Sequence, residues 1–272
     1  MPSISVLMST YRSEKAENLA ASLESVYAQT LPPDQVVLVV DGPVPEEQNE
    51  VIRRFQDDWR VAAMTVVRLP ENLGLAGALN AGLTVCLGEY VARMDSDDIC
   101  LPDRLRLQHD YAVSHPDVDV VSSWSEEFFP EGRRGQIKVS PVGHEHVTEA
   151  LRWRNVLVHP TIFIRTRALR DVGGYSRRFG MLEDYDLFVR LCIAGYRFHV
   201  LPKTLVRVRS SLEQRGRRGG LRYTMNEVAF RIECWRRGFL ATHHLVVTTG
   251  MYVVFRLASG PMRKRIYALA RA

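Results

Sequence analysis

The sequence predicts an α/β protein in which a mixed, mostly parallel central sheet is flanked by helices. Short β-rich runs alternate with helical patterns along the first half, which is typical of consecutive βαβ units. The 272 residues are 46% hydrophobic and 25% charged, enough for one enzyme-sized core. Polar or acidic residues directly follow several of the expected strands, at the edge where open α/β sheets bind ligands.

The first half divides into four strands separated by helices. Residues 4–8 form the first strand, after which Leu19, Leu23 and Val26 recur at helical spacing. The apolar run 36–40 is the second strand and ends at Asp41. The elements that follow are a helix around residues 51–55, a strand at 65–68, a helix at 75–87 and a strand at 90–94.

The second half shows weaker periodicity. Pro102 starts a helix that we expect to reach residue 115. A surface loop or hairpin is expected at 130–143, which is rich in Gly, Pro and Arg. The other expected elements are strands at 118–122, 161–165, 198–201 and 205–208, a helix at 183–194, and two helical segments after the basic, glycine-containing stretch 213–220.

The charge is distributed unevenly. From Arg207 to the end there are 14 Lys and Arg against 3 Asp and Glu, a net charge of +11, so the rest of the +5 chain carries −6. A uniformly basic nucleic-acid binder would not show this division, and we expect no nucleic-acid partner. The basic end suits a surface that meets anionic phosphates or lipid headgroups, although a solvated basic helix has the same composition. The apolar stretch 245–257, followed by the cationic residues 263–265, could lie along a membrane surface.

Compartment signals are few. The four cysteines show neither CxxC pairing nor a disulfide pattern, which favours a reducing cytoplasm. No charged-then-apolar leader opens the chain, and no apolar run reaches the roughly 18 residues of a membrane span. We therefore expect a protein that is neither exported nor integral to a membrane.

The cluster Asp95-Ser96-Asp97-Asp98 is the first candidate site. Three carboxylates so close together repel one another unless a cation or strong donors offset their charge. Carboxylate oxygens suit Mg²⁺ or Mn²⁺, which one or two carboxylates hold together with substrate phosphates. Asp95 and Asp97 are the expected metal contacts, with Asp97 preferred. An Asp-rich turn that caps the following helix is the alternative.

Other polar residues belong to the same sheet edge. Thr10 and Tyr11 end the first strand, and the carboxylate of Asp41 is able to accept hydrogen bonds from a base or a ribose. Asn72 and Gly74 precede a helix whose amides could face an anion. Turn formation at Asp41 and simple capping at Asn72 explain these residues equally well.

Two further candidates lie in the second half. Glu183 and Asp184 open a helix, and a carboxylate there could remove the proton of an attacking hydroxyl, although acidic residues also stabilise helix N-termini. His159, which precedes a proline, is a candidate ligand or acceptor contact, but an isolated histidine is more often structural.

Taken together, these motifs resemble the inverting family 2 glycosyltransferases of the GT-A fold, over nearly the whole chain. The matching segments are Ser5-Val6-Leu7-Met8-Ser9-Thr10-Tyr11, Asp41, Asn72-Leu73-Gly74, Gly88-Glu89-Tyr90-Val91-Ala92-Arg93-Met94-Asp95-Ser96-Asp97-Asp98, Pro102-Asp103-Arg104-Leu105, His159-Pro160-Thr161, Gly173-Gly174-Tyr175 and Glu183-Asp184-Tyr185-Asp186-Leu187. The resemblance implies that the nucleotide sugar contacts Thr10, Tyr11, Arg12, Asp41, Asn72, Gly74, Asp95 and Ser96. It also implies that Asp184, with Glu183 beside it, is the catalytic base, and that His159 and Tyr185 belong to the acceptor side.

The C-terminal section is similar to bacterial members, of the amylovoran type, that build exopolysaccharide, capsule or O-antigen units. This similarity implies a UDP-hexose donor, such as UDP-galactose or UDP-glucose, and an undecaprenyl-diphosphate-linked saccharide acceptor at the inner face of the cytoplasmic membrane. We expect a catalytic domain at residues 1–220, with a nucleotide-sugar half at 1–115 and an acceptor half at 116–220. Residues 221–272 would form a basic helical extension. The sequence does not define an oligomeric state.

Two positions depart from the family pattern. Gly77 stands where relatives often carry Lys or Arg, so the charge of the diphosphate would be met by Arg12 or by the loop residues Arg215 and Arg217. Arg209 stands where a histidine is common, which puts a third protein ligand to the metal in doubt.

Two rival hypotheses remain at this point. The Asp95-Ser96-Asp97 motif follows a strand, as in phosphohydrolases of the haloacid dehalogenase type, but several strands precede it here and Ile99 stands where Thr or Val is usual. A non-catalytic sugar- or lipid-binding subunit of the same fold is the second rival. The presence of a second acidic pair argues against it, because binding alone requires no base.

Overall fold

The computed structural model describes residues 2–57, 63–129, 134–210 and 220–257. Its nine-stranded sheet has the order β3-β2-β1-β4-β8-β6-β9-β5, with β7 paired to β6. The strands are β1 (Ile4–Tyr11), β2 (Gln35–Asp41), β3 (Ala63–Arg68), β4 (Tyr90–Asp95), β5 (Ile99–Cys100), β6 (Val120–Phe128), β7 (Arg134–Lys138), β8 (Phe163–Arg165) and β9 (Phe198–Arg209). The helices are α1 (Ala16–Tyr27), α2 (Glu46–Gln56), α3 (Gly74–Leu83), α4 (Arg104–Ser114), α5 (His144–Trp153), η1 (His159–Thr161), α6 (Thr166–Asp171), α7 (Glu183–Ile193), α9 (Leu221–Arg236) and α10 (Thr242–Leu257).

The first four strands pair in parallel, as the alternation of strands and helices predicts. In the register, Tyr11 of β1 lies opposite Asp41 of β2, and Ser9 lies opposite Asp95 of β4. The carboxyl ends of these strands therefore meet at one edge of the sheet. Helix α3 packs very closely above them, because a Cβ atom on Gly82 would lie 2.4 Å from the Cδ1 atom of Leu7.

The second half of the sheet is mixed. β8 runs antiparallel to both β4 and β6, whereas β6 and β9 pair in parallel. The strands expected at 198–201 and 205–208 are one strand, β9, which stays paired with β6 through register shifts near Trp124. The hairpin expected at 130–143 is present, since β7 pairs antiparallel with β6. Helix α3 ends at Leu83, earlier than the expected residue 87.

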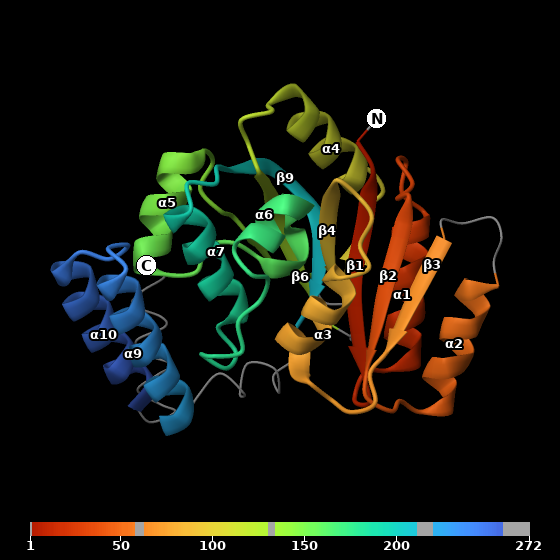
Figure 1. The fold of residues 1–272 in the computed structure, drawn as a ribbon, viewed down its shortest axis with the longest axis horizontal. Coiled ribbons are helices and arrows are strands. Elements are labelled where there is room, and N and C mark those ends of the chain that lie inside the picture. The colour runs from red at the N-terminus through yellow and green to blue at the C-terminus, as the bar shows by residue number, and fades with distance from the viewer. Residues whose placement is uncertain (1, 58–62, 130–133, 211–219, 258–272) are drawn as a thin grey trace.

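Helices cover both faces of the sheet (Figure 1). One core lies between the sheet and α1, α2 and α4, and contains Leu19, Ile52 and Leu105. The other core lies between the sheet and α3, α5, α6, α7 and α9, and contains Leu79 and Phe188. This arrangement confirms the prediction of a mixed central sheet flanked by helices.

The C-terminal helices are joined to the second core. The ring of Phe230 on α9 lies 4.8 Å from the ring of Tyr185 on α7 and 5.4 Å from that of Phe179. Within α9 and α10, Arg231 pairs with Glu227 in a buried site and lies over the ring of Tyr252. None of the helices in the described ranges is long and apolar enough to cross a bilayer. The cationic residues 263–265 lie outside the described residues.

Candidate active site

Three carboxylates converge where β4 ends. Asp95, Asp97 and Asp98 each contribute an oxygen, and these oxygens lie within 4.8 Å of one another. The chain turns tightly here, because the Asp98 amide donates to the Asp95 carbonyl and β5 begins at Ile99. The Ser22 hydroxyl on α1 also donates to the Asp95 carbonyl, at 2.9 Å. The neighbouring elements thus fix the main chain of the acidic turn.

One carboxylate of the cluster is buried, whereas the other two are partly exposed. Asp98 is 1% exposed, and its Oδ1 atom accepts a hydrogen bond of 2.7 Å from the Arg209 amide. Its Oδ2 atom is buried without a hydrogen-bond partner among the described residues. Burial, followed by repulsion from Asp95 and Asp97, raises the pKa of Asp98 well above its usual range. Oxygen ligands in this arrangement fit a divalent cation such as Mg²⁺ or Mn²⁺.

A buried arginine on β4 faces the same cluster. Arg93 is 1% exposed, and its Nη2 atom forms an ion pair with Oδ1 of Asp95. Its Nε and Nη1 atoms have no hydrogen-bond partner among the described residues. Sequence reasoning missed Arg93, although a charged residue in the middle of a buried strand is a signal of a paired, functional charge.

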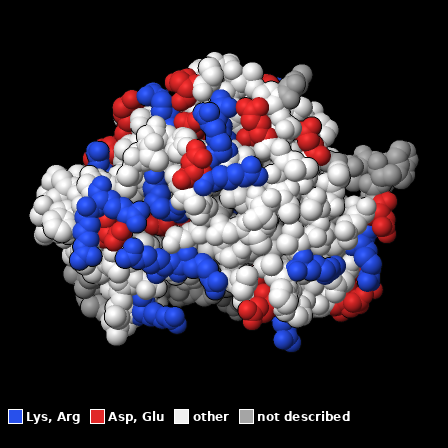
Figure 2. Space-filling view, viewed as in Figure 1, with Lys and Arg blue, Asp and Glu red and all other residues white. Residues whose placement is uncertain are grey.

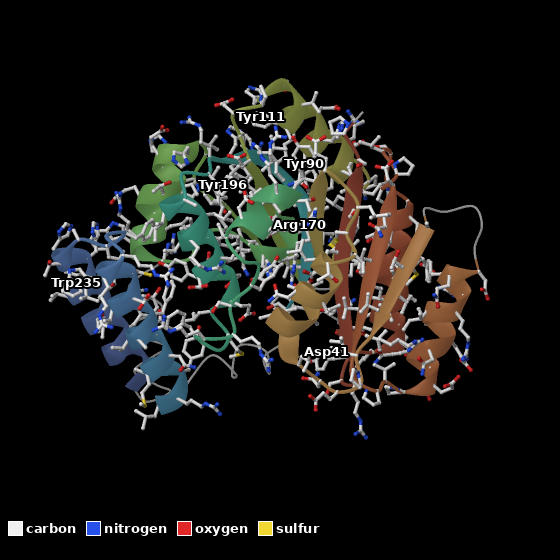
Figure 3. All side chains as sticks on the ribbon, in the orientation of Figure 1. Asp41, Tyr90, Tyr111, Arg170, Tyr196 and Trp235 are labelled. Carbon is white, nitrogen blue, oxygen red and sulfur yellow. The ribbon has the colours of Figure 1, made fainter. Side chains whose placement is uncertain are left out.

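The end of β2 forms a second part of this edge. Asp41 is buried, and its Oδ1 atom accepts a hydrogen bond of 2.6 Å from the Leu73 amide. The Asn72 side chain donates to the Asp41 carbonyl at 3.2 Å, and its Oδ1 atom accepts from the Gly74 amide. Asp41 and the segment before α3 are therefore joined at the lower edge of the sheet in the view of Figure 3.

The other predicted nucleotide contacts differ in exposure. Thr10 is buried and its hydroxyl donates to Oε1 of Gln48, while the Gln48 amide donates to the Tyr11 carbonyl at 3.1 Å. Ser96 is buried and Arg12 is exposed. Gln48, on α2, was not among the predicted site residues, and it holds the loop that leaves β1.

The acidic pair Glu183-Asp184 begins α7. Asp184 accepts a hydrogen bond of 3.0 Å from the Asn155 side chain at Oδ2, and one from the Tyr185 amide at Oδ1. Burial, followed by the charge of Asp184, raises the pKa of Glu183 to about 7. The charges of Arg93 and Asp95 also act on Glu183, so the two acidic groups belong to one electrostatic site.

Two predicted acceptor residues lie in enclosed surroundings. His159 is buried with Nε2 at 3.1 Å from the Tyr175 hydroxyl, and burial, followed by the charge of Arg93, lowers its pKa well below the usual value. The prediction for Tyr185 is not supported by its position. Its ring lies in the core against Phe230 and its hydroxyl donates to the Leu151 carbonyl, because position 185 faces inward on α7.

The basic residues predicted near the diphosphate are partly described. Arg215 and Arg217 lie outside the described residues. Arg209 lies beside the acidic turn, where its Nε atom donates to the Asp97 carbonyl at 3.0 Å. Its guanidinium carbon lies 4.7 Å from the centroid of the Phe128 ring.

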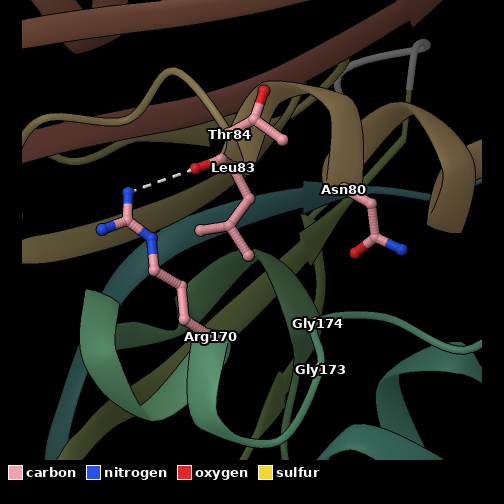
Figure 4. A pocket seen from close by; sticks show the side chains of 6 residues that line it. All are labelled: Asn80, Leu83, Thr84, Arg170, Gly173 and Gly174. Atoms are coloured by element: carbon pink, nitrogen blue, oxygen red, sulfur yellow. Dashed lines mark hydrogen bonds between the residues drawn. The ribbon is translucent and has the colours of Figure 1, made fainter.

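A separate pocket of about 340 Å³ lies between α3 and the residues after α6. Its lining consists of Asn80, Leu83, Thr84, Arg170, Gly173 and Gly174 (Figure 4). Asn80 donates to the Tyr175 carbonyl and accepts from the Tyr175 amide, which holds the loop that carries the partner of His159. None of the lining residues is a predicted site residue. Asn80 acts indirectly, because it positions Tyr175, whose hydroxyl contacts His159.

The raised pKa of Glu183 predicts a specific pH dependence of stability. Between pH 4.5 and about 7 the folded chain retains a proton on Glu183 that the unfolded chain has lost. This difference lowers the free energy of unfolding as the pH rises, by at most about 3 kcal/mol. Glu183→Gln removes this contribution, so its stability relative to the wild type should increase from pH 5 to pH 8. Denaturant unfolding in EDTA at both pH values measures the difference, and an unchanged difference would contradict the prediction.

Comparisons with known proteins identify the family. Residues 5–173, which carry the acidic turn, match Glycosyl transferase family 2. The chain is a family 2 glycosyltransferase. It is 39% identical over 224 residues to the amylovoran biosynthesis glycosyltransferase AmsE of Erwinia amylovora, covering 82% of each chain. It is 32% identical to the UDP-Gal:alpha-D-GlcNAc-diphosphoundecaprenol beta-1,3-galactosyltransferase of Escherichia coli, covering 98% of this chain and 95% of that one.

Solved structures confirm the GT-A fold of this glycosyltransferase. The structure of S. aureus TarS 1-349 in complex with UDP-GlcNAc superposes with a TM-score of 0.72 at 19% identity, covering 94% of this chain and 73% of that chain. The mannosyltransferase PcManGT of Pyrobaculum calidifontis, in complex with GDP-Man and Mn²⁺, gives a TM-score of 0.64 at 20% identity, covering 99% of this chain and 80% of that chain. The family assignment excludes a phosphohydrolase of the haloacid dehalogenase type, and the relatives named as glycosyltransferases support an enzyme over a non-catalytic subunit.

Proposed function

We propose that this glycosyltransferase moves a hexose, galactose or glucose, from a UDP-sugar to a lipid-diphosphate-linked saccharide, with inversion at the anomeric carbon. The observation that carries the proposal is the convergence of the Asp95, Asp97 and Asp98 oxygens within 4.8 Å at the end of β4, with Glu183 close enough for the charge of Asp95 to act on it. The relatives support the substrate classes, since one is named for amylovoran biosynthesis and the other for a UDP-Gal donor and a diphosphoundecaprenol acceptor.

The donor half of the site is formed by the strand ends. Asp41, fixed by the Leu73 amide, would bind the base or ribose, and the other donor contacts would be Thr10, Tyr11, Arg12, Asn72, Gly74 and Ser96. Asp95 and Asp97 would hold Mn²⁺ or Mg²⁺, and the PcManGT complex with Mn²⁺ supports a divalent metal. When bound, the cation would neutralise charge on the leaving diphosphate.

The acceptor half supplies the base. Asp184 removes the proton of the acceptor hydroxyl as its oxygen bonds to the anomeric carbon, and the bond from that carbon to the diphosphate oxygen breaks with its electron pair leaving on UDP. Asn155 orients Asp184 through the hydrogen bond to Oδ2. His159 stays neutral through its low pKa and supports the site through Tyr175.

The C-terminal extension, residues 221–272, would bring the catalytic domain, residues 1–220, to the inner face of the cytoplasmic membrane as a peripheral protein. Leu221 and Met225 on α9, and Val246 and Met251 on α10, are all more than 60% exposed. On the face shown in Figure 2, many Lys and Arg side chains gather over the half of the molecule that carries α7 and α9. Exposed apolar and cationic side chains together suit an anionic lipid surface.

A panel of nucleotide sugars, with and without Mn²⁺ or Mg²⁺, tests the donor assignment. We expect UDP-hexoses to bind and to be slowly hydrolysed only with metal, and GDP- and dTDP-sugars to bind at least about 10-fold more weakly, a difference of 1.4 kcal/mol. Calorimetry and release of free UDP measure the two effects. Binding of no nucleotide sugar in the presence of metal would overturn the proposal.

A further inference from the structure

The end of β9 places an arginine against the acidic turn. The Arg209 amide donates to Asp98 at 2.7 Å, and its Nε atom donates to the Asp97 carbonyl at 3.0 Å. The side chain therefore crosses the turn that carries the expected metal ligands. Arg209 is far from Asp41 and Asn72 in the sequence, so only the fold brings it to the sheet edge that carries the acidic turn.

The guanidinium of Arg209 is held in a fixed orientation. The Nε hydrogen bond anchors one edge, and the Phe128 ring, 4.7 Å from the guanidinium carbon, supports one face. Its Nη1 and Nη2 atoms make no hydrogen bond or ion pair within the described ranges, which leaves four N–H donors in one plane. The side chain is half-buried, so these donors are not fully solvated.

The neighbouring arginine on the same strand is used differently. The Nε atom of Arg207 lies 3.3 Å from Oε2 of Glu126, and its guanidinium carbon lies 5.0 Å from the centroid of the same Phe128 ring. Its charge is thus compensated by a carboxylate. Arg209 has no carboxylate side chain within ion-pair distance in the part of the chain that the structure describes.

A diphosphate beside the acidic turn requires more positive charge than one cation supplies. The two carboxylates that would hold the cation already offset its two positive charges, so the charge of the diphosphate requires a further partner, and Gly77 on α3 supplies none. A planar guanidinium with parallel N–H groups matches the oxygens of a phosphate group.

We propose that Arg209 binds the diphosphate of the nucleotide donor directly, next to the divalent cation at Asp95 and Asp97. The proposal rests on the nucleotide-sugar function given above. It assigns Arg209 a contact with the leaving group, so that its charge also stabilises UDP as the glycosidic bond to the diphosphate breaks. Arg209 then contributes a positive charge to the site and no ligand to the metal.

The test compares Arg209→Gln and Arg209→Lys with the matched control Arg207→Gln, using the full chain. Calorimetry measures the affinities for UDP, UMP and uridine in Mn²⁺, and for Mn²⁺ alone. Arg209→Gln should weaken UDP binding by about 10- to 100-fold, weaken UMP binding less, and leave uridine binding unchanged. Arg209→Lys should recover part of the loss, and Arg207→Gln should bind UDP as the wild type does.

Binding of Mn²⁺ alone separates this role from a structural one. If Arg209 acts on the diphosphate, its removal leaves the Mn²⁺ affinity unchanged or increases it, because a nearby positive charge is lost. Equal weakening of Mn²⁺, UDP and uridine binding in Arg209→Gln would show that the residue only supports the acidic turn, and would overturn the proposal. UDP binding equal to that of the wild type would overturn it as well. A wild-type chain that fails to bind UDP in Mn²⁺ would instead reject the donor assignment itself.

Discussion

Asp184→Asn is expected to lower the rate of sugar transfer by about 10²- to 10⁴-fold, the usual contribution of a general base. The substitution keeps the size of the side chain, and the single amide oxygen, Oδ1, of the new residue is able to accept the hydrogen bond from the Asn155 side chain. It removes the charge that takes up the acceptor proton. Donor binding should remain within about 2-fold of the wild type, since the loss of a group that acts only on the acceptor hydroxyl lowers turnover without weakening ground-state binding of the donor.

Radiolabel transfer to a lipid-linked acceptor and calorimetry with the UDP-sugar measure these two effects. Asp171→Asn is the matched control, because Asp171 is an exposed carboxylate at the end of α6 whose Oδ2 atom accepts from the Tyr196 hydroxyl. Near-normal turnover of Asp184→Asn would remove the base assignment and leave Glu183 as the alternative.

Asp97→Ala is expected to abolish metal-dependent donor binding. Loss of an outer-shell partner already weakens metal binding by about 10- to 100-fold, and loss of a direct ligand should cost at least about 100-fold. Asp97 is half-buried at the turn, so its replacement leaves the two cores intact. We therefore expect a folded protein with an unchanged melting temperature in EDTA.

Titration with Mn²⁺, followed by UDP titration at saturating metal, measures the loss. Asp103→Ala provides the control, since Asp103 lies close in sequence but pairs with Arg106 and accepts from Thr30 on the surface. Retention of Mn²⁺ affinity in Asp97→Ala would leave Asp95 and Asp98 as the metal ligands.

Much of the sheet edge at Asp41 and Asp95 was predictable because local patterns determine it. The strands that end at Asp41 and Asp95 are buried apolar runs with turn residues behind them, and parallel pairing then aligns their ends. The beginning of α7 at Glu183 was predictable for a similar reason, since acidic residues precede an amphipathic segment.

The partners of these residues were not predictable from local pattern. Gln48, Asn80 and Asn155 are ordinary polar residues on helices or loops, and only the fold gives them their contacts with the loop after β1, with Tyr175 and with Asp184. The sequence likewise did not separate the buried position of Tyr185 from the partly exposed position of Asp184, since both lie in the first turn of one helix. Short helices such as α6, with six residues, leave too few positions to reveal a period.

The contact between Phe230 and Tyr185 limits how this enzyme can be recombined with its relatives. The ring that supports α7 belongs to α9, and Arg178 before α7 pairs with Glu233 on α9 at 3.4 Å. A chimera joined at residue 220 would replace Phe230 and Glu233 on α9. It would keep their partners, Tyr185 and Arg178, from the original chain. Chimeras that exchange residues 176–257 as one block keep both sides together. In this half of the enzyme, α7 and α9 should therefore be exchanged together, because α9 packs against the helix that carries Glu183 and Asp184.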